Sequence, residues 1–195
     1  PCPFLVGLSD WHNTWLEHPE DGPYWWQFNV EKYHDQIETP TYHQGGWYDI
    51  FLAGTLRNYL GMKRRARTAQ ARQSQRLIIG PWVHGSGNIG VSKAGEWDFG
   101  PAAAQDFNRM RLPWFDHWLK GKDNGVMEEL PVRIFVMGRN EWRREADWPL
   151  PDTRYTNYYL HEGQSGSINS LNDGTLSPLA PDGSEHLDSF AYDPD

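Results

Sequence analysis

The stretch QGGWYDIFLAG, residues 44–54, decides the fold of this chain. A short extended segment, residues 41–44, precedes its two glycines, and residues 50–60 have the composition of a helix that Gly61 is expected to end. Glycine allows the tight backbone path that a turn between a strand and a helix requires. The stretch therefore predicts a strand, a turn at the glycine pair and a helix.

A second stretch, RLIIGPWVHGSG, residues 76–87, opens with a compact apolar run that is typical of a strand buried on both faces. Gly80 and Pro81 are expected to end this strand abruptly. Strand, helix and strand predict one βαβ unit, and turns after parallel strands lie at one edge of a sheet, where open α/β sheets bind ligands. Because Asp49 follows the first strand and His84 the second, we expect their side chains to meet.

An aspartate beside a histidine can carry acid-base chemistry. A neutral imidazole, with an ordinary pKa of about 6.5, takes a proton from a nucleophile and returns it to a leaving group. A buried carboxylate on the other ring nitrogen fixes the tautomer and stabilises the cation. Trp47 and Trp82 are expected to shield such a pair from water. The alternative is that Asp49 caps the following helix and His84 is an ordinary loop histidine, and the residues leave both open.

Aromatic residues shape the elements on either side of this unit. Residues 1–38 predict a small helical region that starts at Ser9 or Asp10. Another helix is expected at residues 102–119, because its apolar side chains recur at helical spacing, with Pro113 introducing a kink. We interpret the aromatic residues of this second helix as core and not as a ligand-binding set.

The composition changes from residue 130 onward. PVRIFVMGRNEWRR, RYTNYYLHEG and HLDSFAYD are short β-rich runs separated by turn residues. They predict an antiparallel sheet that begins near residue 130. Such a sheet needs a covering layer, and the chain stops at Asp195 before supplying one, so we expect the chain to be truncated there.

Length, charge and cysteine content narrow the class of protein. The 195 residues suffice for one domain and part of another, and eleven Trp supply much of the apolar bulk. A net charge of −8 argues against general nucleic-acid binding. The basic residues between Lys63 and Arg76 are interpreted as a solvated surface connection. A single cysteine, Cys2, excludes an intrachain disulfide framework.

The sequence leaves the cellular compartment open. No segment approaches the ~20 apolar residues of a membrane span, and the first residues lack the pattern of a signal peptide. The chain does not begin with Met, so a targeting signal upstream stays an alternative. The low cysteine content slightly favours the cytoplasm, and secretion or a periplasmic location is not excluded.

The motifs GGWYDIF, GPWVHG, GEWDFG, LPWFDHWLKG and VRIFVMGRNEWRREADWPLP resemble those of one family. This is the X-Pro dipeptidyl-peptidase and cocaine-esterase-like family of serine hydrolases, which includes α-amino acid ester hydrolases. The resemblance implies an α/β fold: the C-terminal portion of an α/β-hydrolase domain with part of a helical cap, followed by an incomplete antiparallel β-sandwich of the jelly-roll type. It implies a cap remnant at residues 1–38, the α/β-hydrolase part at 39–128 and the start of the jelly roll at 129–195.

Carried over by motif, Asp49 matches the family's triad acid and His84 its triad base. The order Ser, Asp, His of α/β-hydrolases places the serine before both, yet no G-x-S-x-G elbow precedes Asp49. Ser9 is the only serine before Asp49, and it lacks the flanking glycine and the preceding buried strand. We therefore expect this chain to be a fragment of a longer protein, with the nucleophile outside it, and to be inactive alone.

The hypothesis drawn from the resemblance is a serine hydrolase that cleaves ester or amide bonds of acyl, aminoacyl or X-Pro dipeptidyl substrates. Expected partners are small ester, amide or peptide substrates, with homo-oligomerisation open and no cofactor or metal implied. The alternative from another class is a non-catalytic module that binds carbohydrate or protein through a Trp-rich surface. A metal hydrolase is disfavoured, because the spacings between His12, His18, His34 and His43 match no metal-binding motif. We interpret His43 as a hydrogen-bonded sheet histidine.

Overall fold

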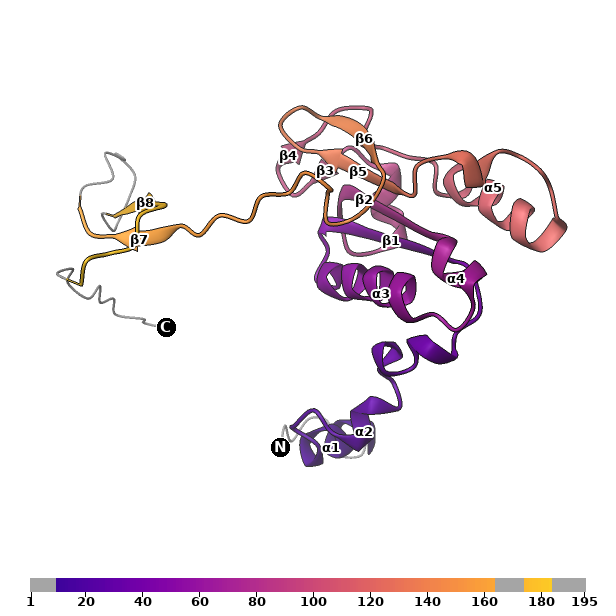
Figure 1. The fold of residues 1–195 in the computed structure, drawn as a ribbon, viewed down its shortest axis with the longest axis horizontal. Coiled ribbons are helices and arrows are strands. Elements are labelled where there is room, and N and C mark those ends of the chain that lie inside the picture. Colours follow the sequence, from indigo (N-terminus) through magenta and orange to yellow (C-terminus); the bar gives the residue numbers. More distant parts are fainter. Residues whose placement is uncertain (1–9, 164–173, 184–195) are drawn as a thin grey trace. The chain divides into compact units, whose positions relative to one another are not determined.

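The computed structural model describes residues 10–163 and 174–183. The chain divides into two compact units, residues 1–151 and 152–195. The first unit contains a sheet of four strands in the order β1, β2, β5, β6 (Figure 1), namely β1 Thr41–Tyr48, β2 Gln75–Val83, β5 Val132–Val136 and β6 Glu141–Glu145. Strand β2 pairs in parallel with both β1 and β5, whereas β6 is antiparallel to β5. The predicted βαβ unit is confirmed.

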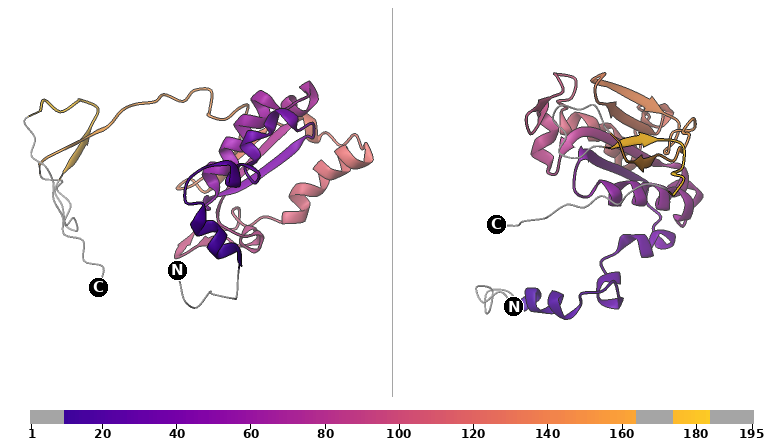
Figure 2. Two further views of the ribbon diagram at one scale, coloured as in Figure 1. Left: turned by 90° about the horizontal axis from the view of Figure 1, so that it is seen from below. Right: turned by 90° about the vertical axis from the view of Figure 1, so that its left-hand side faces the viewer.

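Helices cover both faces of this sheet (Figures 1 and 2). On one face, Leu77 and Ile79 of β2 pack against Tyr59 of α3. On the other face, Ile78 and Trp82 pack near the start of α5. The helices and short strands of the first unit are α1 Asp10–Glu17, α2 Pro23–Trp26, η2 Val30–Lys32, η3 His34–Gln36, α3 Leu52–Arg65, α4 Ala69–Gln73, η4 Ser86–Gly90, β3 Lys93–Ala94, β4 Trp97–Asp98, α5 Phe107–Lys120 and η5 Val126–Glu128.

The turn predicted at the glycine pair is wrong, because β1 continues through both glycines to Tyr48. The reason lies in the neighbouring strand: a Cβ atom on Gly46 would lie 2.0 Å from the carbonyl oxygen of Trp82. Glycine is needed here for close approach of two backbones and not for a turn. Gly80 and Pro81 likewise do not end β2, which runs on to Val83.

Gly61 does not end the helix as predicted, since α3 continues to Arg65. Its small size serves packing instead, because a Cβ atom there would lie 2.1 Å from the imidazole ring of His34. The ring is 1% exposed and is held on both sides, Nε2 by Asn58 Oδ1 at 2.9 Å and Nδ1 by an N–H of Arg65 at 2.9 Å. Glycine lets η3 dock against α3.

Helix α5 starts later than the predicted residue 102. Asp106 caps it, because its Oδ1 accepts the backbone N–H groups of Asn108 and Arg109 at 2.9 and 3.0 Å. At the other end Gly121, with φ +65°, terminates the helix as the polar KDNG stretch predicts. The expectation of core aromatics is confirmed for Trp114, which is 4% exposed, whereas Phe115 is 44% exposed.

The antiparallel sheet expected from residue 130 does not include the first β-rich run. Residues of β5 pair in parallel with β2, so the run that contains β5 and β6 extends the α/β sheet. A buried apolar strand such as β5, with Val132 and Phe135 at 0 and 1% exposure, fits a central position in a parallel sheet. The domain limits at residues 38 and 128 stay predictions.

The second unit, described over residues 152–163 and 174–183, contains two antiparallel strands, β7 Tyr159–His161 and β8 Thr175–Ser177. The run RYTNYYLHEG therefore contributes a strand as predicted. The run HLDSFAYD and the N-cap candidate Ser9 lie outside the described residues.

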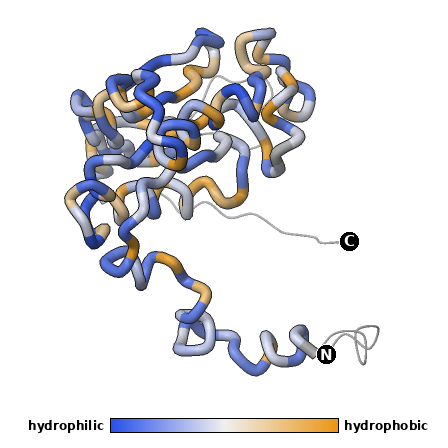
Figure 3. Tube along the Cα trace, turned by 90° about the vertical axis from the view of Figure 1, so that its right-hand side faces the viewer, coloured by the Kyte–Doolittle hydropathy of each residue, from blue (hydrophilic) through white to orange (hydrophobic). Residues whose placement is uncertain are grey.

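Hydrophobic stretches along the chain trace are short and alternate with hydrophilic ones (Figure 3). In the described part of the chain, no helix is long and apolar enough to cross a membrane. The aromatic residues of α1 and α2 are largely at the surface, with Trp11 54%, Trp15 46% and Trp26 38% exposed.

Candidate active site

Asp49 and His84 meet at the carboxyl end of the parallel sheet. Imidazole Nδ1 of His84 lies 3.1 Å from carboxylate Oδ1 of Asp49. The Asp49 side chain is 14% exposed and the His84 side chain 58% exposed. The contact expected from the βαβ topology is therefore present, with a shielded acid and an accessible imidazole.

Strands β1 and β2 bring the two side chains together through an irregularity in their register. The strands pair regularly up to Gly46 and Gly80, and the register shifts before Tyr48 pairs with Val83. The absence of a side chain at Gly46 lets the β2 backbone come close at this point. Both chain segments then leave the sheet beside each other, at Asp49 and His84.

Asp49 also organises the start of α3. Its Oδ1 accepts the backbone N–H of Phe51 at 2.8 Å, and its carbonyl oxygen accepts the N–H of Leu52 at 3.0 Å. The helix-capping alternative is wrong, because Phe51 is the N-cap residue of α3 and no side chain caps the helix. The backbone N–H fixes the carboxylate in the position from which it contacts His84.

The loop after β2 holds His84 through its backbone. Gly85 has a φ of +108°, a conformation that favours glycine. The side-chain amide of Asn88 donates to the His84 carbonyl oxygen at 2.7 Å. The imidazole meets the Phe51 ring edge-on at a centroid distance of 4.9 Å, and among the described residues Nε2 has no hydrogen-bond partner. That nitrogen is available to a reacting group.

A cavity of about 180 Å³ lies beside the pair. Trp82 lines it, as expected. Trp47 does not: it is partly buried, packs against the core on the α3 face and donates its indole N–H to the carbonyl oxygen of Phe135 at 2.7 Å. Gln44 contributes a buried amide oxygen that lacks a hydrogen-bond partner within the described chain. The remaining lining residues are Gly45, Gly46, Asp49, Val83, His84, Gly85, Ile89 and Phe107.

The two buried histidines, His34 and His43, are held by protein groups. His43, 8% exposed, contacts Gln75 Oε1 through Nε2 at 2.7 Å, which confirms its interpretation as a hydrogen-bonded sheet histidine. Burial lowers the pKa of His43. In the residues that the structure describes, no group of three or more His, Cys, Asp or Glu side chains is placed to hold a metal ion.

Sequence reasoning missed the residues that support the pair. Asn88 anchors the His84 loop and Phe51 contacts the imidazole. Phe51 lies two positions after Asp49 in the same turn. This closeness in sequence could have indicated that Phe51 also lies near His84. Nothing in the local pattern distinguishes Asn88 from any other polar loop residue.

Comparisons with known proteins agree with these features. The sequence profile of the X-Pro dipeptidyl-peptidase (S15 family) matches residues 7–86, and that of the X-Pro dipeptidyl-peptidase C-terminal non-catalytic domain matches residues 124–194. The chain is 34% identical to the cocaine esterase of Rhodococcus sp. (strain MB1 Bresler) over 196 residues, which is 98% of this chain and 32% of that protein. The chain thus spans about a third of that relative's length.

Two solved structures share the fold. An α-amino acid ester hydrolase matches 93% of this chain and 29% of its own with a TM-score of 0.67 and 24% identity. An aminopeptidase from the marine sediment archaeon Thaumarchaeota archaeon matches 82% of this chain and 30% of its own with a TM-score of 0.61 and 20% identity. From the two profiles and the esterase relative, the chain belongs to the X-Pro dipeptidyl-peptidase and cocaine-esterase-like family of serine hydrolases.

Proposed function

We propose that Asp49 and His84 are the acid and the base of a Ser-His-Asp triad that cleaves ester or amide bonds. The observation that carries this proposal is the 3.1 Å contact between Nδ1 of His84 and Oδ1 of Asp49 at the carboxyl end of two parallel strands. The family gives the reaction class, hydrolysis of an acyl, aminoacyl or X-Pro dipeptidyl bond.

The orientation of the imidazole suits a general base. With Nδ1–H donating to Asp49, the tautomer leaves the lone pair on Nε2, which has no partner in the described chain. Nε2 takes the proton of the serine hydroxyl as its oxygen attacks the substrate carbonyl, and then gives that proton to the leaving group. Asp49 stabilises the imidazolium formed between these steps.

The second half of the reaction uses the same groups. Nε2 of His84 takes a proton from water, the hydroxide adds to the acyl carbonyl, and the proton passes to the serine oxygen as the acid is released. The nucleophile and the oxyanion-binding N–H groups are proposed to come from a part of the protein outside this chain, since no serine is among the described residues that line the cavity.

The experiment replaces His84 by alanine in the full-length protein and measures ester hydrolysis together with fluorophosphonate labelling. Loss of the base is expected to lower kcat on the order of 10⁶-fold and to abolish labelling, as for the triad histidine of other serine hydrolases. Because the His84 side chain is largely exposed, the melting temperature is expected to change little.

His117 provides the matched control. It lies on α5, where Nδ1 contacts the Lys122 carbonyl oxygen at 3.0 Å, and it is not among the residues that line the cavity. His117→Ala is expected to keep full turnover. Undiminished turnover in the His84→Ala protein would refute the assignment.

A second function is favoured by the exposed aromatic side chains. Trp11 and Trp15 on α1 and Trp26 on α2 are accessible, as in surfaces that bind carbohydrate or protein. The two functions separate in one assay: a binding module keeps its ligand affinity, and shows no labelling, whether His84 is present or not. A jelly-roll fold after β6, a cap remnant at residues 1–38 and homo-oligomerisation are also proposed. A structure of the full-length protein tests the first two, and its mass in solution tests the third.

A further inference from the structure

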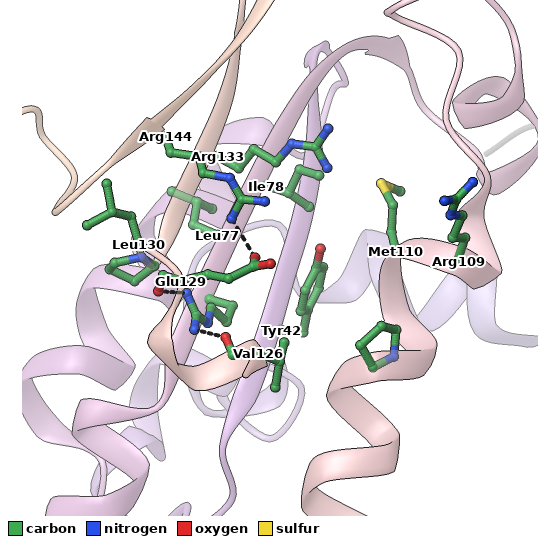
Figure 4. Close-up of a pocket in the computed structure, with 13 residues that line it drawn as sticks. Tyr42, Leu77, Ile78, Arg109, Met110, Val126, Glu129, Leu130, Arg133 and Arg144 are labelled. Atoms are coloured by element: carbon green, nitrogen blue, oxygen red, sulfur yellow. Dashed lines mark hydrogen bonds and ion pairs between the residues drawn. The ribbon is translucent and has the colours of Figure 1, made fainter. Parts of the chain in front are cut away.

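A second cavity, of about 160 Å³, lies at the other end of the sheet (Figure 4). Arginines line it from three adjacent strands, at the second position of β2 and of β5 and near the end of β6, and from the first turn of α5. These side chains are Arg76, Arg133, Arg144 and Arg109. The single acidic side chain among the described lining residues is Glu129. The lining therefore carries an excess of three positive charges.

Arg76 is the most deeply placed of the four, at 6% exposure. Its guanidinium donates to the backbone carbonyl oxygens of Val126 and Glu129. These acceptors fix the position of the group without neutralising its charge. A guanidinium has five N–H donors, so further donors stay available to a ligand. The interpretation of Arg76 as part of a solvated surface connection is wrong, because the residue is buried.

Arg133 and Arg144 are also fixed with donors to spare. Arg133 donates to Gln105 Oε1 at 3.1 Å and lies 4.3 Å over the ring of Trp142. Arg144 pairs with a Glu129 carboxylate oxygen at 2.5 Å. A planar guanidinium held in place loses less conformational freedom when it binds a ligand, because its orientation is already set.

Two further groups face this cavity without a partner. Within the described ranges, the Arg109 side chain makes no hydrogen bond or ion pair, and the Tyr42 hydroxyl makes no hydrogen bond. Figure 4 shows the Tyr42 ring between the strand arginines and α5, which carries Arg109 and Met110. Donors thus converge on one space from opposite sides.

The charge in this cavity is not balanced by the protein around it. Burial lowers the pKa of Arg76, the carboxylate of Glu129 opposes this shift, and the positive charge of Arg144 adds to it. Burial, and then the positive charge of Arg144, lower the pKa of Arg133. Half-buried cations in proximity are costly unless a counter-charge is present. The single carboxylate, which pairs with Arg144, supplies only part of it.

We propose that this arginine-lined cavity binds a small oxyanion, the phosphate or carboxylate group of a small molecule. Guanidinium groups match the planar, paired oxygens of carboxylate and phosphate and bind them through two parallel N–H···O bonds. The cavity shares no lining residue with the one at His84 and lies at the amino ends of the strands whose carboxyl ends carry Asp49 and His84. The site is therefore separate from the proposed hydrolase centre and does not depend on it.

The test is isothermal titration calorimetry of the full-length protein at pH 7.5 with inorganic phosphate and, separately, with succinate. Ionic strength is held constant with sodium chloride, so general screening does not contribute. Saturable binding of phosphate alone identifies a phosphate site, and binding of succinate alone identifies a carboxylate site. Absence of saturable binding of either anion overturns the proposal.

Two variants change the expected affinity in opposite directions. Arg109→Gln removes a charge that has no partner in the described chain and is expected to weaken anion binding about tenfold without changing the melting temperature. Glu129→Gln removes the competing carboxylate and is expected to tighten binding. Saturable binding whose affinity changes in neither variant would place the anion outside this cavity and overturn the proposal.

Arg139→Gln is the matched control. This arginine is 78% exposed, lies outside the cavity and pairs with Glu141 at 3.7 Å. Its loss is expected to leave the affinity for the anion unchanged. An equal loss of affinity in Arg109→Gln and Arg139→Gln would show that only net charge matters, which contradicts a specific site.

Discussion

The two ends of the β1–β2 strand pair carry different chemistry. At the carboxyl end, an accessible imidazole contacts a shielded carboxylate, and glycines bring the backbones close. At the amino end, arginines are fixed by backbone carbonyl oxygens and a single carboxylate. The first arrangement leaves one imidazole nitrogen without a hydrogen-bond partner in the described chain, whereas the second holds permanent charge. Proton transfer fits the first end, and anion binding fits the second.

Two histidines illustrate the same contrast. His43 in β1 is 8% exposed, contacts Gln75 and has a pKa lowered by burial. His84 after β2 is largely exposed and contacts a carboxylate. Burial away from water keeps an imidazole neutral, as for His43. Position along the strand therefore decides whether an imidazole is enclosed by the protein or accessible to a ligand.

The largest expected effect is at the carboxyl end. Asp49→Asn in the full-length protein is expected to lower kcat by about 10⁴-fold, because the amide neither fixes the tautomer of His84 nor stabilises its cation. Steady-state hydrolysis of an ester substrate measures it. The backbone N–H of Phe51 still finds an oxygen acceptor in asparagine, so the melting temperature serves as the control for folding. A loss of less than tenfold would contradict the role of Asp49 as the triad acid.

A substitution at the strand pair tests the geometry behind the contact. Gly46→Ala is expected to destabilise the fold by about 3 kcal/mol, because its Cβ meets a backbone oxygen that cannot move without shifting β2. Gly45→Ala is the matched control, since its Cβ meets only side-chain atoms at 3.3 Å or more. Denaturant unfolding compares the two proteins. Similar stabilities would show that the strands do not need this approach.

The amino end responds to loss of its fixed charge. Arg76→Met is expected to cost about 2 kcal/mol of folding free energy, because the carbonyl oxygens of Val126 and Glu129 lose their donors. The kcat of the folded protein is expected to stay unchanged, in contrast to Asp49→Asn. Urea unfolding and hydrolysis measured on one preparation test both statements. A matching fall in kcat would link the two ends and contradict their separation.

The smallest expected effect concerns pH. The folded-state pKa of His43 is lowered, so the unfolded chain binds more protons, and the stability contributed by neutral His43 is present above about pH 6.5 and is lost as pH falls below it. His43→Gln is expected to flatten the dependence of unfolding free energy on pH between 7.5 and 5.5 by less than about 1.4 kcal/mol per pH unit. An unchanged slope would assign the dependence to other groups.

Parts of the fold were predictable because they depend on local signals. The apolar run at β2 and the helix after Asp49 predicted the parallel unit, and from that topology the meeting of Asp49 and His84. The ends of elements were less predictable. Gly61 is a typical residue for the end of a helix, yet α3 continues past it to Arg65. The glycine instead makes room for the imidazole ring of His34. The residues around a glycine do not show which distant side chain will pack against it.

The sequence by itself determined which residue types stand at the strand ends, the −8 charge that argues against nucleic acid, and the motifs that resemble a hydrolase family. Only the tertiary structure decided that β5 joins the parallel sheet, that Gly46 serves a backbone contact and that four arginines from four elements surround one cavity. Hydrophobic periods of two residues in a strand and 3.6 residues in a helix describe one element at a time. Contacts between elements depend on side chains far apart in sequence, whose meeting is set by register and packing.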